Sequence, residues 1–168
     1  MKINREALGA PAFRSLMAGH PSGVAVVTTL DAAGEPQGLT CSSLCSVSVE
    51  PPLLLVCIAN HSRTLAALDS LGLFAVNLLH DHGRDVARHF SSNLGDRFRA
   101  VTWAGTKEAD LPYLPDDAHS VAECRLHSVT VAGDHTIIVG EVFSVDHLAP
   151  ARPLIYGLRQ YAAWPKEG

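Results

Sequence analysis

The sequence predicts a mainly β fold, in which six or seven antiparallel strands and a few short helices form a closed or split barrel. Three observations point to this class. Apolar runs of strand length recur along the 168 residues, clusters of turn residues separate them, and two long β runs near the C-terminus enclose a tight turn. Since the sequence shows no internal repeat, linker or low-complexity segment, we expect a single domain over residues 1–168.

Composition narrows the class of protein further. Hydrophobic residues make up 47% of the chain and charged residues 18%, which is typical of a globular domain that buries a core without disulfides. The net charge is −4 and no long basic run occurs, so nucleic acid is a poor candidate partner. The N-terminal stretch has no continuous apolar segment of signal-peptide length, and no apolar run in the chain approaches a membrane span, so we expect a soluble cytoplasmic protein.

The cysteines and histidines form no known metal or redox motif. No C-x-x-C pair and no H-E-x-x-H spacing occurs, although His80 and His82 alternate as on a strand end. We therefore expect no metal site. The four cysteines lie in apolar, strand-like runs, which is typical of small, reduced core residues. They are Cys41, Cys45, Cys57 and Cys124.

The N-terminal segment predicts one helix followed by a β hairpin. Apolar residues at helical spacing indicate a helix over about residues 5–18, and Pro11 should delay or break its start. Residues 24–29 are a β run. The turn residues at positions 31–36 lead into a second strand, so we expect these two strands to pair in antiparallel fashion.

This second strand, expected over residues 38–49, carries a dense run of hydroxyl groups. Successive side chains of a strand point to opposite faces, which gives one apolar and one polar face. The apolar, core-directed face holds Leu39, Cys41, Cys45, Val47 and Val49. The polar face holds Thr40, Ser42, Ser46 and Ser48. The pattern fits a solvated outer face, and it equally fits a strand whose hydroxyls and backbone lie against a flat polar ligand.

Polar residues also cluster where the next strand ends and a helix begins. The apolar run at residues 53–58 predicts a buried strand, and Ser62 stands at the N-cap position of the helix that follows. Free backbone N–H groups, the positive end of the helix dipole and nearby donors such as Arg63 suit a phosphate group. An ordinary capped helix is the alternative.

The middle of the chain predicts a strand, a helix and a long loop. Residues 74–79 form a β run in which Asn77 is the lone polar side chain. Asp81 can cap a helix over residues 82–90. Residues 91–115 contain several prolines and glycines, and we expect them to be mostly loop.

The last third predicts two long strands around a turn, at residues 121–131 and 136–145. The turn between them ends in His135. A short strand is expected over residues 154–156. A histidine at a hairpin tip is often merely exposed to solvent, so its position alone does not indicate a function.

Five motifs occur in a fixed order along the chain. They are residues 21–29, residues 38–43 with 48–53, residues 60–64, residues 74–77, and residues 133–136 with 140–142. Together they resemble the short-chain flavin reductases, the reductase components of two-component flavin-dependent monooxygenases. The resemblance implies a homodimeric split β-barrel of Greek-key type that reduces FAD or FMN with NADH or NADPH. The reduced flavin would then diffuse to a partner monooxygenase.

The resemblance also implies roles for particular residues. The strand that runs along the isoalloxazine ring is matched by Thr40, Cys41, Ser42 and Ser43. The flavin-phosphate loop is matched by Asn60, Ser62 and Thr64. Further polar positions near the flavin are matched by Asn77 and Ser91. His135 matches the histidine near the nicotinamide and the flavin, and it is the candidate catalytic residue.

The implied chemistry needs no nucleophile or general base. Hydride would pass directly from the nicotinamide to the flavin, so the protein would stack, orient and polarise the two rings. His135 would position the nicotinamide or balance charge rather than transfer a proton. One motif departs from the family, since the usual Phe-Pro-Thr-Gly-Val is His-Pro-Ser-Gly-Val at residues 20–24. The resemblance therefore does not define the form of the entry to the nicotinamide face.

Three other functions also fit parts of the sequence. A flavin-binding module for storage or sensing would share the barrel and the phosphate loop without oxidising a nicotinamide. An enzyme resembling pyridoxamine phosphate oxidase would use flavin to oxidise an amine, but we locate no basic cluster for a substrate phosphate. A simple interaction barrel would bind no flavin at all.

Overall fold

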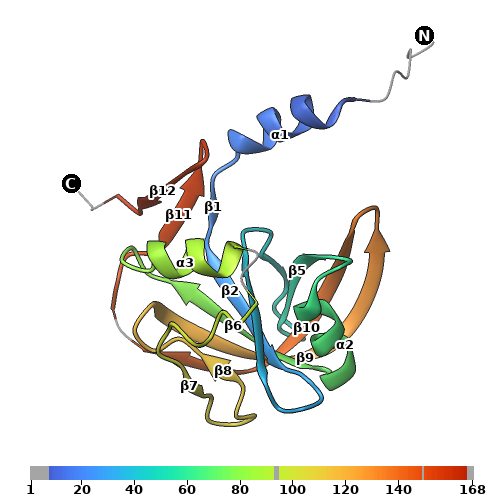
Figure 1. Ribbon diagram of the computed structural model, residues 1–168, viewed down its shortest axis with the longest axis vertical. Coiled ribbons are helices and arrows are strands. Elements are labelled where there is room, and N and C mark those ends of the chain that lie inside the picture. The colour runs from blue at the N-terminus through green and yellow to red at the C-terminus, as the bar shows by residue number, and fades with distance from the viewer. Residues whose placement is uncertain (1–7, 93–94, 149, 166–168) are drawn as a thin grey trace.

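The computed structural model describes residues 8–92, 95–148 and 150–165. Its main element is a seven-stranded antiparallel sheet with the strand order β3-β2-β6-β9-β10-β5-β4 (Figure 1). The strands of this sheet are β2 (Ala25–Leu30), β3 (Pro36–Cys41), β4 (Cys45–Ser48), β5 (Leu53–Ala59), β6 (Leu73–Leu79), β9 (Ala118–Ala132) and β10 (His135–His147).

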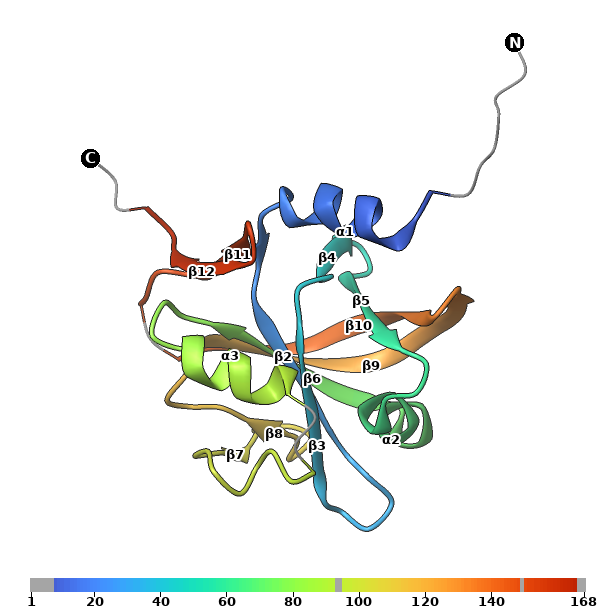
Figure 2. The same ribbon diagram turned by 45° about the horizontal axis from the view of Figure 1, so that its top comes forward.

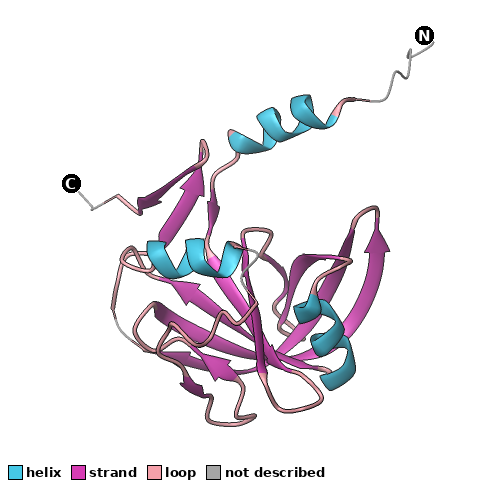
Figure 3. Ribbon diagram, in the orientation of Figure 1, coloured by secondary structure: helices cyan, strands magenta, loops and turns pink. Residues whose placement is uncertain are grey.

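Two small sheets and three helices accompany the main sheet, and strands dominate the molecule (Figure 3). A three-stranded sheet is formed by β1 (Ser22–Gly23), β11 (Leu154–Gly157) and β12 (Gln160–Ala163). A two-stranded sheet is formed by β7 (Ala104–Gly105) and β8 (Pro112–Tyr113). The helices are α1 (Ala10–Ala18), α2 (Arg63–Leu71) and α3 (Arg84–Ser91). Both α2 and α3 contact β3, from its two sides (Figure 2).

The predicted mainly β, antiparallel fold with few short helices is confirmed. Its edge strands, β3 and β4, are not hydrogen-bonded to each other within the described residues. The closed barrel that the sequence also allowed is therefore wrong, because a closed barrel has no unpaired edges.

A short link forces the main sheet to curl. Only residues 42–44 join β3, at one edge, to β4, at the other. The four Cα–Cα steps from Cys41 to Cys45 reach at most about 15 Å, whereas six strand spacings of about 4.8 Å in a flat sheet amount to about 29 Å. The sheet must therefore bend until its two edges approach each other, and this brings β3 close to β5.

The single strand expected over residues 38–49 is wrong. Just after β3, the hydroxyl of Ser43 hydrogen-bonds the backbone of Cys57, and the chain crosses from one edge of the sheet to the other. The alternation of faces does not continue across this break. Cys45 is therefore exposed rather than buried, and Val49, also expected in the core, is 89% exposed.

The core lies on both faces of β2. Val26 packs in one apolar cluster with Phe90 of α3, whereas Val27 packs in a second cluster with Leu68 of α2 and Phe74 of β6. Burial on both faces explains why this strand reads as a continuous apolar run rather than an alternating one. Each such side chain contributes about 1.5–3 kcal/mol to stability when it is fully buried.

The N-terminal ends of α1 and α3 lie later in the sequence than the helix starts expected from the sequence. Pro11 lies in the first turn of α1, which confirms the delayed start, and residues 5–7 of the expected helix lie outside the described residues. The start of α3 is at Arg84, and Asp81 does not cap it. The carboxylate of Asp81 instead accepts a hydrogen bond from Arg152 at 2.5 Å, which links the turn before α3 to the segment before β11.

The cysteine prediction is confirmed in part. Cys41 and Cys124 are buried and Cys57 is half-buried, but Cys45 is exposed. Burial raises the pKa of the Cys124 thiol to about 12. Among residues 8–92, 95–148 and 150–165, no three His, Cys, Asp or Glu side chains are placed to hold a metal ion. None of the helices in this part of the chain is long and apolar enough to cross a membrane.

Gly140 of β10 provides a test of the packing at the centre of the sheet. A Cβ at this position would lie 2.8 Å from Cε1 of Phe74 and 3.1 Å from Cβ of Cys124. Because the Phe74 ring is fully buried, we expect Gly140→Ala to lower the free energy of unfolding by about 1–3 kcal/mol. Urea denaturation would measure this change. Gly23→Ala is the matched control, since a Cβ there meets no atom of the described residues within 4 Å, and an equal effect of both variants would contradict the explanation.

Candidate functional site

A polar cavity of about 420 Å³ opens where the two edges of the curled sheet approach each other. Its walls come from β3, β5, the N-terminus of α2, the C-terminal end of α3, the loop after α3 and the first residue of β10. The lining residues are Gln37, Leu39, Thr40, Cys57, Ile58, Ala59, His61, Ser62, Arg63, Thr64, Phe90, Ser91, Arg97 and His135. Segments distant in sequence thus form one concave site, as expected of a small-molecule pocket.

One end of the cavity is the N-terminus of α2. Ser62 is the N-cap residue, as the sequence predicts, but its side chain makes no capping hydrogen bond. Within the described residues, the hydroxyls of Ser62 and Thr64 have no hydrogen-bond partner, and both residues line the cavity. The first N–H groups of a helix have no partner inside the helix. Hydroxyl donors, backbone donors and the positive end of the helix dipole therefore converge here.

Two arginines lie at the same end of the cavity. Arg63 donates from Nη2 to the carbonyl of Gly95 at 2.6 Å, and Arg97 donates from Nη1 to the carbonyl of Gly38 at 2.6 Å. Burial and the nearby charge of Arg63 lower the pKa of Arg97. In the described part of the chain, no carboxylate lies within ion-pair distance of either guanidinium. Arginine remains charged at neutral pH, so this end is suited to an anion.

His135 lies on the strand wall formed by β5 and β10, beside the turn that leads into α2. It is the first residue of β10 and pairs with Ala59 of β5. Its Nδ1 lies 2.7 Å from a carboxylate oxygen of Asp134, and this hydrogen bond lowers the pKa of Asp134. The side chain of His135 is 48% exposed, so Asp134 can orient an imidazole that a ligand can still reach.

Five of the ten sequence-predicted site residues line the cavity. They are Thr40, Ser62, Thr64, Ser91 and His135. Two of their hydroxyls are already used within the protein, because Thr40 donates to the carbonyl of Ala87 at 2.6 Å and Ser91 donates to that of Arg88 at 2.8 Å. The other five residues do not line the cavity, and they are Cys41, Ser42, Ser43, Asn60 and Asn77.

The Ser43 hydroxyl does not line the cavity but hydrogen-bonds the backbone of Cys57. The ladder between β4 and β5 ends at the pair of Cys45 and Leu55. Beyond it, the Ser43 hydroxyl accepts a hydrogen bond from the N–H of Cys57 at 2.9 Å and can donate to its carbonyl at 3.2 Å. Ser43 thus takes the place of a neighbouring strand, while Cys41 next to it is buried and Ser42 is exposed.

Asn60 joins the turn of the long hairpin to the end of β5. Its Nδ2 donates to the carbonyl of Gly133 at 3.0 Å, and its Oδ1 accepts from the hydroxyl of Thr136 at 2.8 Å. The backbone N–H of Asn60 also donates to the carbonyl of Asp134. Asn60 therefore holds the residues on either side of His135 rather than facing the cavity.

Asn77 is fully buried in the core. Its Nδ2 donates to the carbonyl of Val26 at 3.0 Å and to the hydroxyl of Thr28 at 3.2 Å, and its Oδ1 accepts from the N–H of Leu114 at 2.9 Å. These three bonds connect β6 to β2 and to the segment after β8. A buried amide needs such partners, so its contacts are those of a structural residue.

Several lining residues were absent from the sequence-based set. They are Gln37, Leu39, Cys57, Ile58, Ala59, His61, Arg63, Phe90 and Arg97. Arg63 has a local signal, because it follows the N-cap of α2 and the sequence places it among the donors there. Arg97 has none, since its place depends on a hydrogen bond to Gly38, 59 positions earlier in the chain.

The fold and the cavity define a class: a β-sheet protein with a concave site for a small ligand that carries an anionic group. The chain belongs to the family of flavin reductase-like domains, whose model matches residues 17–165. The resemblance to flavin reductases that the sequence showed is thereby confirmed.

Two relatives and one solved structure illustrate the similarity. The chain is 47% identical over 157 residues to a flavin reductase (NADPH) from Lentzea aerocolonigenes, covering 92% of this chain and 90% of the relative. It is 33% identical over 159 residues to HsaB, the reductase subunit of a flavin-dependent monooxygenase from Rhodococcus jostii, covering 95% and 80%. An NADH:FAD oxidoreductase from Streptomyces globisporus, solved with NAD and FAD fragments, superimposes with a TM-score of 0.85 at 31% identity, covering 95% of this chain and 97% of that one.

The hydrogen bonds of Ser43 predict an effect on stability. We expect Ser43→Ala to lower the free energy of unfolding by about 1–2 kcal/mol, because it leaves the N–H and carbonyl of Cys57 without this partner. Ser42→Ala is the matched control, since Ser42 is exposed, and its effect should stay within about 0.5 kcal/mol. Thermal or urea unfolding of both variants would decide. Equal stabilities would show that water replaces the Ser43 hydroxyl at no cost.

Proposed function

We propose that this protein is an NAD(P)H:flavin oxidoreductase that reduces FAD or FMN and supplies the reduced flavin, by diffusion, to a partner monooxygenase. The observation that carries the proposal is the cavity itself, which is lined by the start of α2, by His135 and by two arginines that form no ion pair with a carboxylate among the described residues. The name of the relative HsaB, a monooxygenase reductase subunit, supports the part that concerns the partner.

The residues present fit a flavin phosphate. Ser62, Thr64 and the first N–H groups of α2 would donate to the phosphate oxygens, with Arg63 and Arg97 supplying positive charge. The apolar side chains of Leu39, Ile58 and Phe90 and the backbone of β3 would then lie along the rest of the flavin.

The chain supplies binding and orientation, and the bound flavin supplies the capacity to accept a hydride. His135, oriented by Asp134 at the mouth of the cavity, would contact the nicotinamide and align it. Backbone N–H groups beside the ring would stabilise negative charge as it develops, because donors fixed in advance need no reorganisation. No side chain needs to transfer a proton in this scheme.

An assay of nicotinamide oxidation tests the proposed activity directly. The purified protein should consume NADH or NADPH only when FAD or FMN is added. Binding of flavin without consumption of either nicotinamide would instead establish a storage or sensor module. Consumption that did not depend on flavin would contradict both functions.

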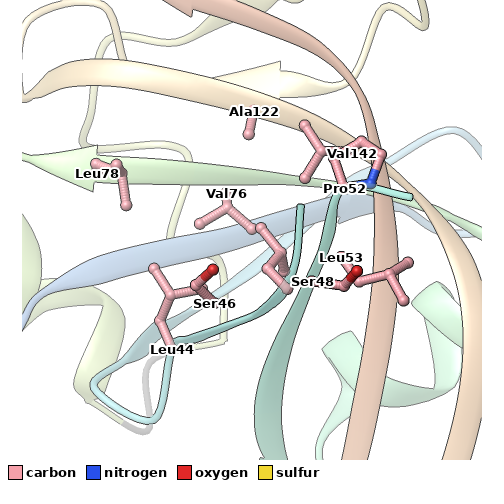
Figure 4. A pocket seen from close by; sticks show the side chains of 10 residues that line it. Leu44, Ser46, Ser48, Pro52, Leu53, Val76, Leu78, Ala122 and Val142 are labelled. Atoms are coloured by element: carbon pink, nitrogen blue, oxygen red, sulfur yellow. The ribbon is translucent and has the colours of Figure 1, made fainter. Parts of the chain in front are cut away.

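The same proposal includes a homodimer in which the open, curled sheet is a split barrel of Greek-key type. An apolar groove of about 300 Å³ lies beside the edge strand β4 (Figure 4). Its lining includes Leu44, Leu53, Val76, Leu78 and Val142. An apolar concave face next to an unpaired edge strand is typical of a surface that another chain covers. We propose that a second copy covers it and lies close to the flavin.

We also propose that the protein works in the cytoplasm. Its four cysteines are free, and the thiol of Cys45 is exposed. Such thiols persist in a reducing compartment, where disulfides are rare.

The proposed homodimer predicts the molecular mass in solution, and it predicts that a charged substitution in the apolar groove halves this mass. Light scattering at micromolar concentration should give about twice 17.9 kDa. Leu44→Glu should yield monomers, because it places a charge in the apolar groove. Val131→Glu, at an exposed position on β9 outside the groove, is the matched control and should leave the dimer intact. A fully active wild-type monomer would rule out the homodimer.

The anion-binding end predicts a loss of flavin affinity. Ser62→Ala combined with Thr64→Val should weaken flavin binding by about 1–3 kcal/mol, because charge-assisted hydrogen bonds to the phosphate are lost. Titration followed by flavin fluorescence would measure the dissociation constant. Ser70→Ala, on an exposed position of α2, should change nothing. An unaltered dissociation constant in the double variant would show that the hydroxyls of Ser62 and Thr64 do not bind the flavin phosphate.

His135 predicts an effect on hydride transfer rather than on flavin binding. His135→Ala should lower kcat/KM for the nicotinamide on the order of 10–100-fold, since misalignment of reacting atoms is penalised steeply. Stopped-flow reduction of the bound flavin would separate a slower transfer from a weaker nicotinamide complex. His127→Ala, an exposed position on β9, is the control. A wild-type rate with an unchanged KM would move the nicotinamide site elsewhere, first to residues 20–22 and 159–161.

A further inference from the structure

A second cavity, of about 330 Å³, lies next to the first along β3. Gln37 lines both cavities. Arg97 lines the first, whereas its neighbours in sequence, Asp96 and Phe98, line the second. The two cavities therefore follow one another along the same strand, with Arg97 at the boundary between them.

The second cavity has the side chains that recognise a nucleoside. Trp103 lines it, is 41% exposed, and stands edge-on to Phe98 with 5.8 Å between ring centroids. Phe98 packs in the same way on Phe90, at 5.0 Å, so a row of three rings runs from the first cavity to the second. A partly exposed, supported indole is suited to stacking on a purine base.

Two charged side chains complete this cavity. Glu35 and Arg99 both line it, and within the described residues neither side chain has a hydrogen-bond or ion-pair partner. The carboxylate of Asp96, by contrast, is engaged, because it accepts from the N–H groups of Phe98 and Arg99 at 3.2 Å each. A free carboxylate is the group that binds ribose hydroxyls in other nucleotide sites, and a guanidinium can pair with phosphate.

We propose that the second cavity takes the adenosine of a bound dinucleotide, and that this dinucleotide is FAD. The inference rests on the function proposed above. With the flavin phosphate at the start of α2, the second phosphate of FAD would pass Arg97 and the adenine would stack on Trp103. The nicotinamide nucleotide also contains an adenosine. However, His135, the residue assigned to the nicotinamide, lines the first cavity and not the second. Trp103 thus makes the protein prefer FAD to FMN.

Dissociation constants for FAD and FMN, measured without nicotinamide, test the proposal. Wild-type protein should bind FAD more tightly than FMN by about 5- to 150-fold, the range expected for one stacked base. Trp103→Ala should abolish this preference while the FMN dissociation constant stays the same, which also shows that the variant is folded. Trp103→Phe is the matched control and should keep most of the preference. Glu35→Ala, which leaves the row of rings intact, should reduce the preference by a smaller factor.

The remaining outcomes distinguish a wrong assignment of the second cavity from a wrong proposed function. Equal affinity of wild-type protein for FAD and FMN would overturn this inference and leave the proposed reductase function standing. A raised KM for NADH in Trp103→Ala, measured with FMN as the acceptor and with an unchanged ratio of FAD to FMN affinity, would assign the cavity to the nicotinamide nucleotide and overturn the assignment to FAD. Failure of the wild-type protein to bind either flavin would overturn the proposed function itself.

Discussion

The candidate site depends on how little chain connects β3 to β4. Three residues cannot cross a flat sheet of seven strands, so the two edges have to meet. At the meeting point the Ser43 hydroxyl holds the backbone of Cys57, where a further strand would otherwise be needed. The cavity exists because of this arrangement, since its walls belong to opposite edges of the same sheet and would lie far apart if the sheet were flat.

The wall that β3 presents to α3 depends in turn on Gly38. A Cβ at this residue would lie 2.9 Å from the ring of Phe90 and 3.2 Å from that of Phe98, so only glycine lets the two rings approach the strand this closely. The carbonyl of the same residue accepts the hydrogen bond of Arg97. One small residue therefore fixes both the aromatic row and the charge at the boundary between the two cavities.

The sequence was informative where neighbouring residues decide the outcome. Ser62 could be placed at a helix start and His135 after a tight turn, and both line the cavity. Distant contacts decide the other cases. Asn77 looks like a ligand-facing amide until Val26 and Leu114 are seen to satisfy it, because a polar residue in a strand has the same pattern in both situations. The break after β3 was missed for a similar reason, since only the sheet order reveals that its two halves lie on opposite edges.

The hydrogen bonds of Arg97 make it a fixed charge rather than a mobile one. A guanidinium has five N–H donors. Three donors of Arg97 are held by carbonyls, with Nη1 bonded to Gly38 and both Nε and Nη2 bonded to Ser92. The side chain has thus lost most of its rotational freedom before any ligand arrives, and an anion that meets the two remaining donors does not have to order it. The Arg97 side chain loses this conformational entropy when the protein folds, whereas a flexible arginine loses it when the ligand binds, which weakens binding.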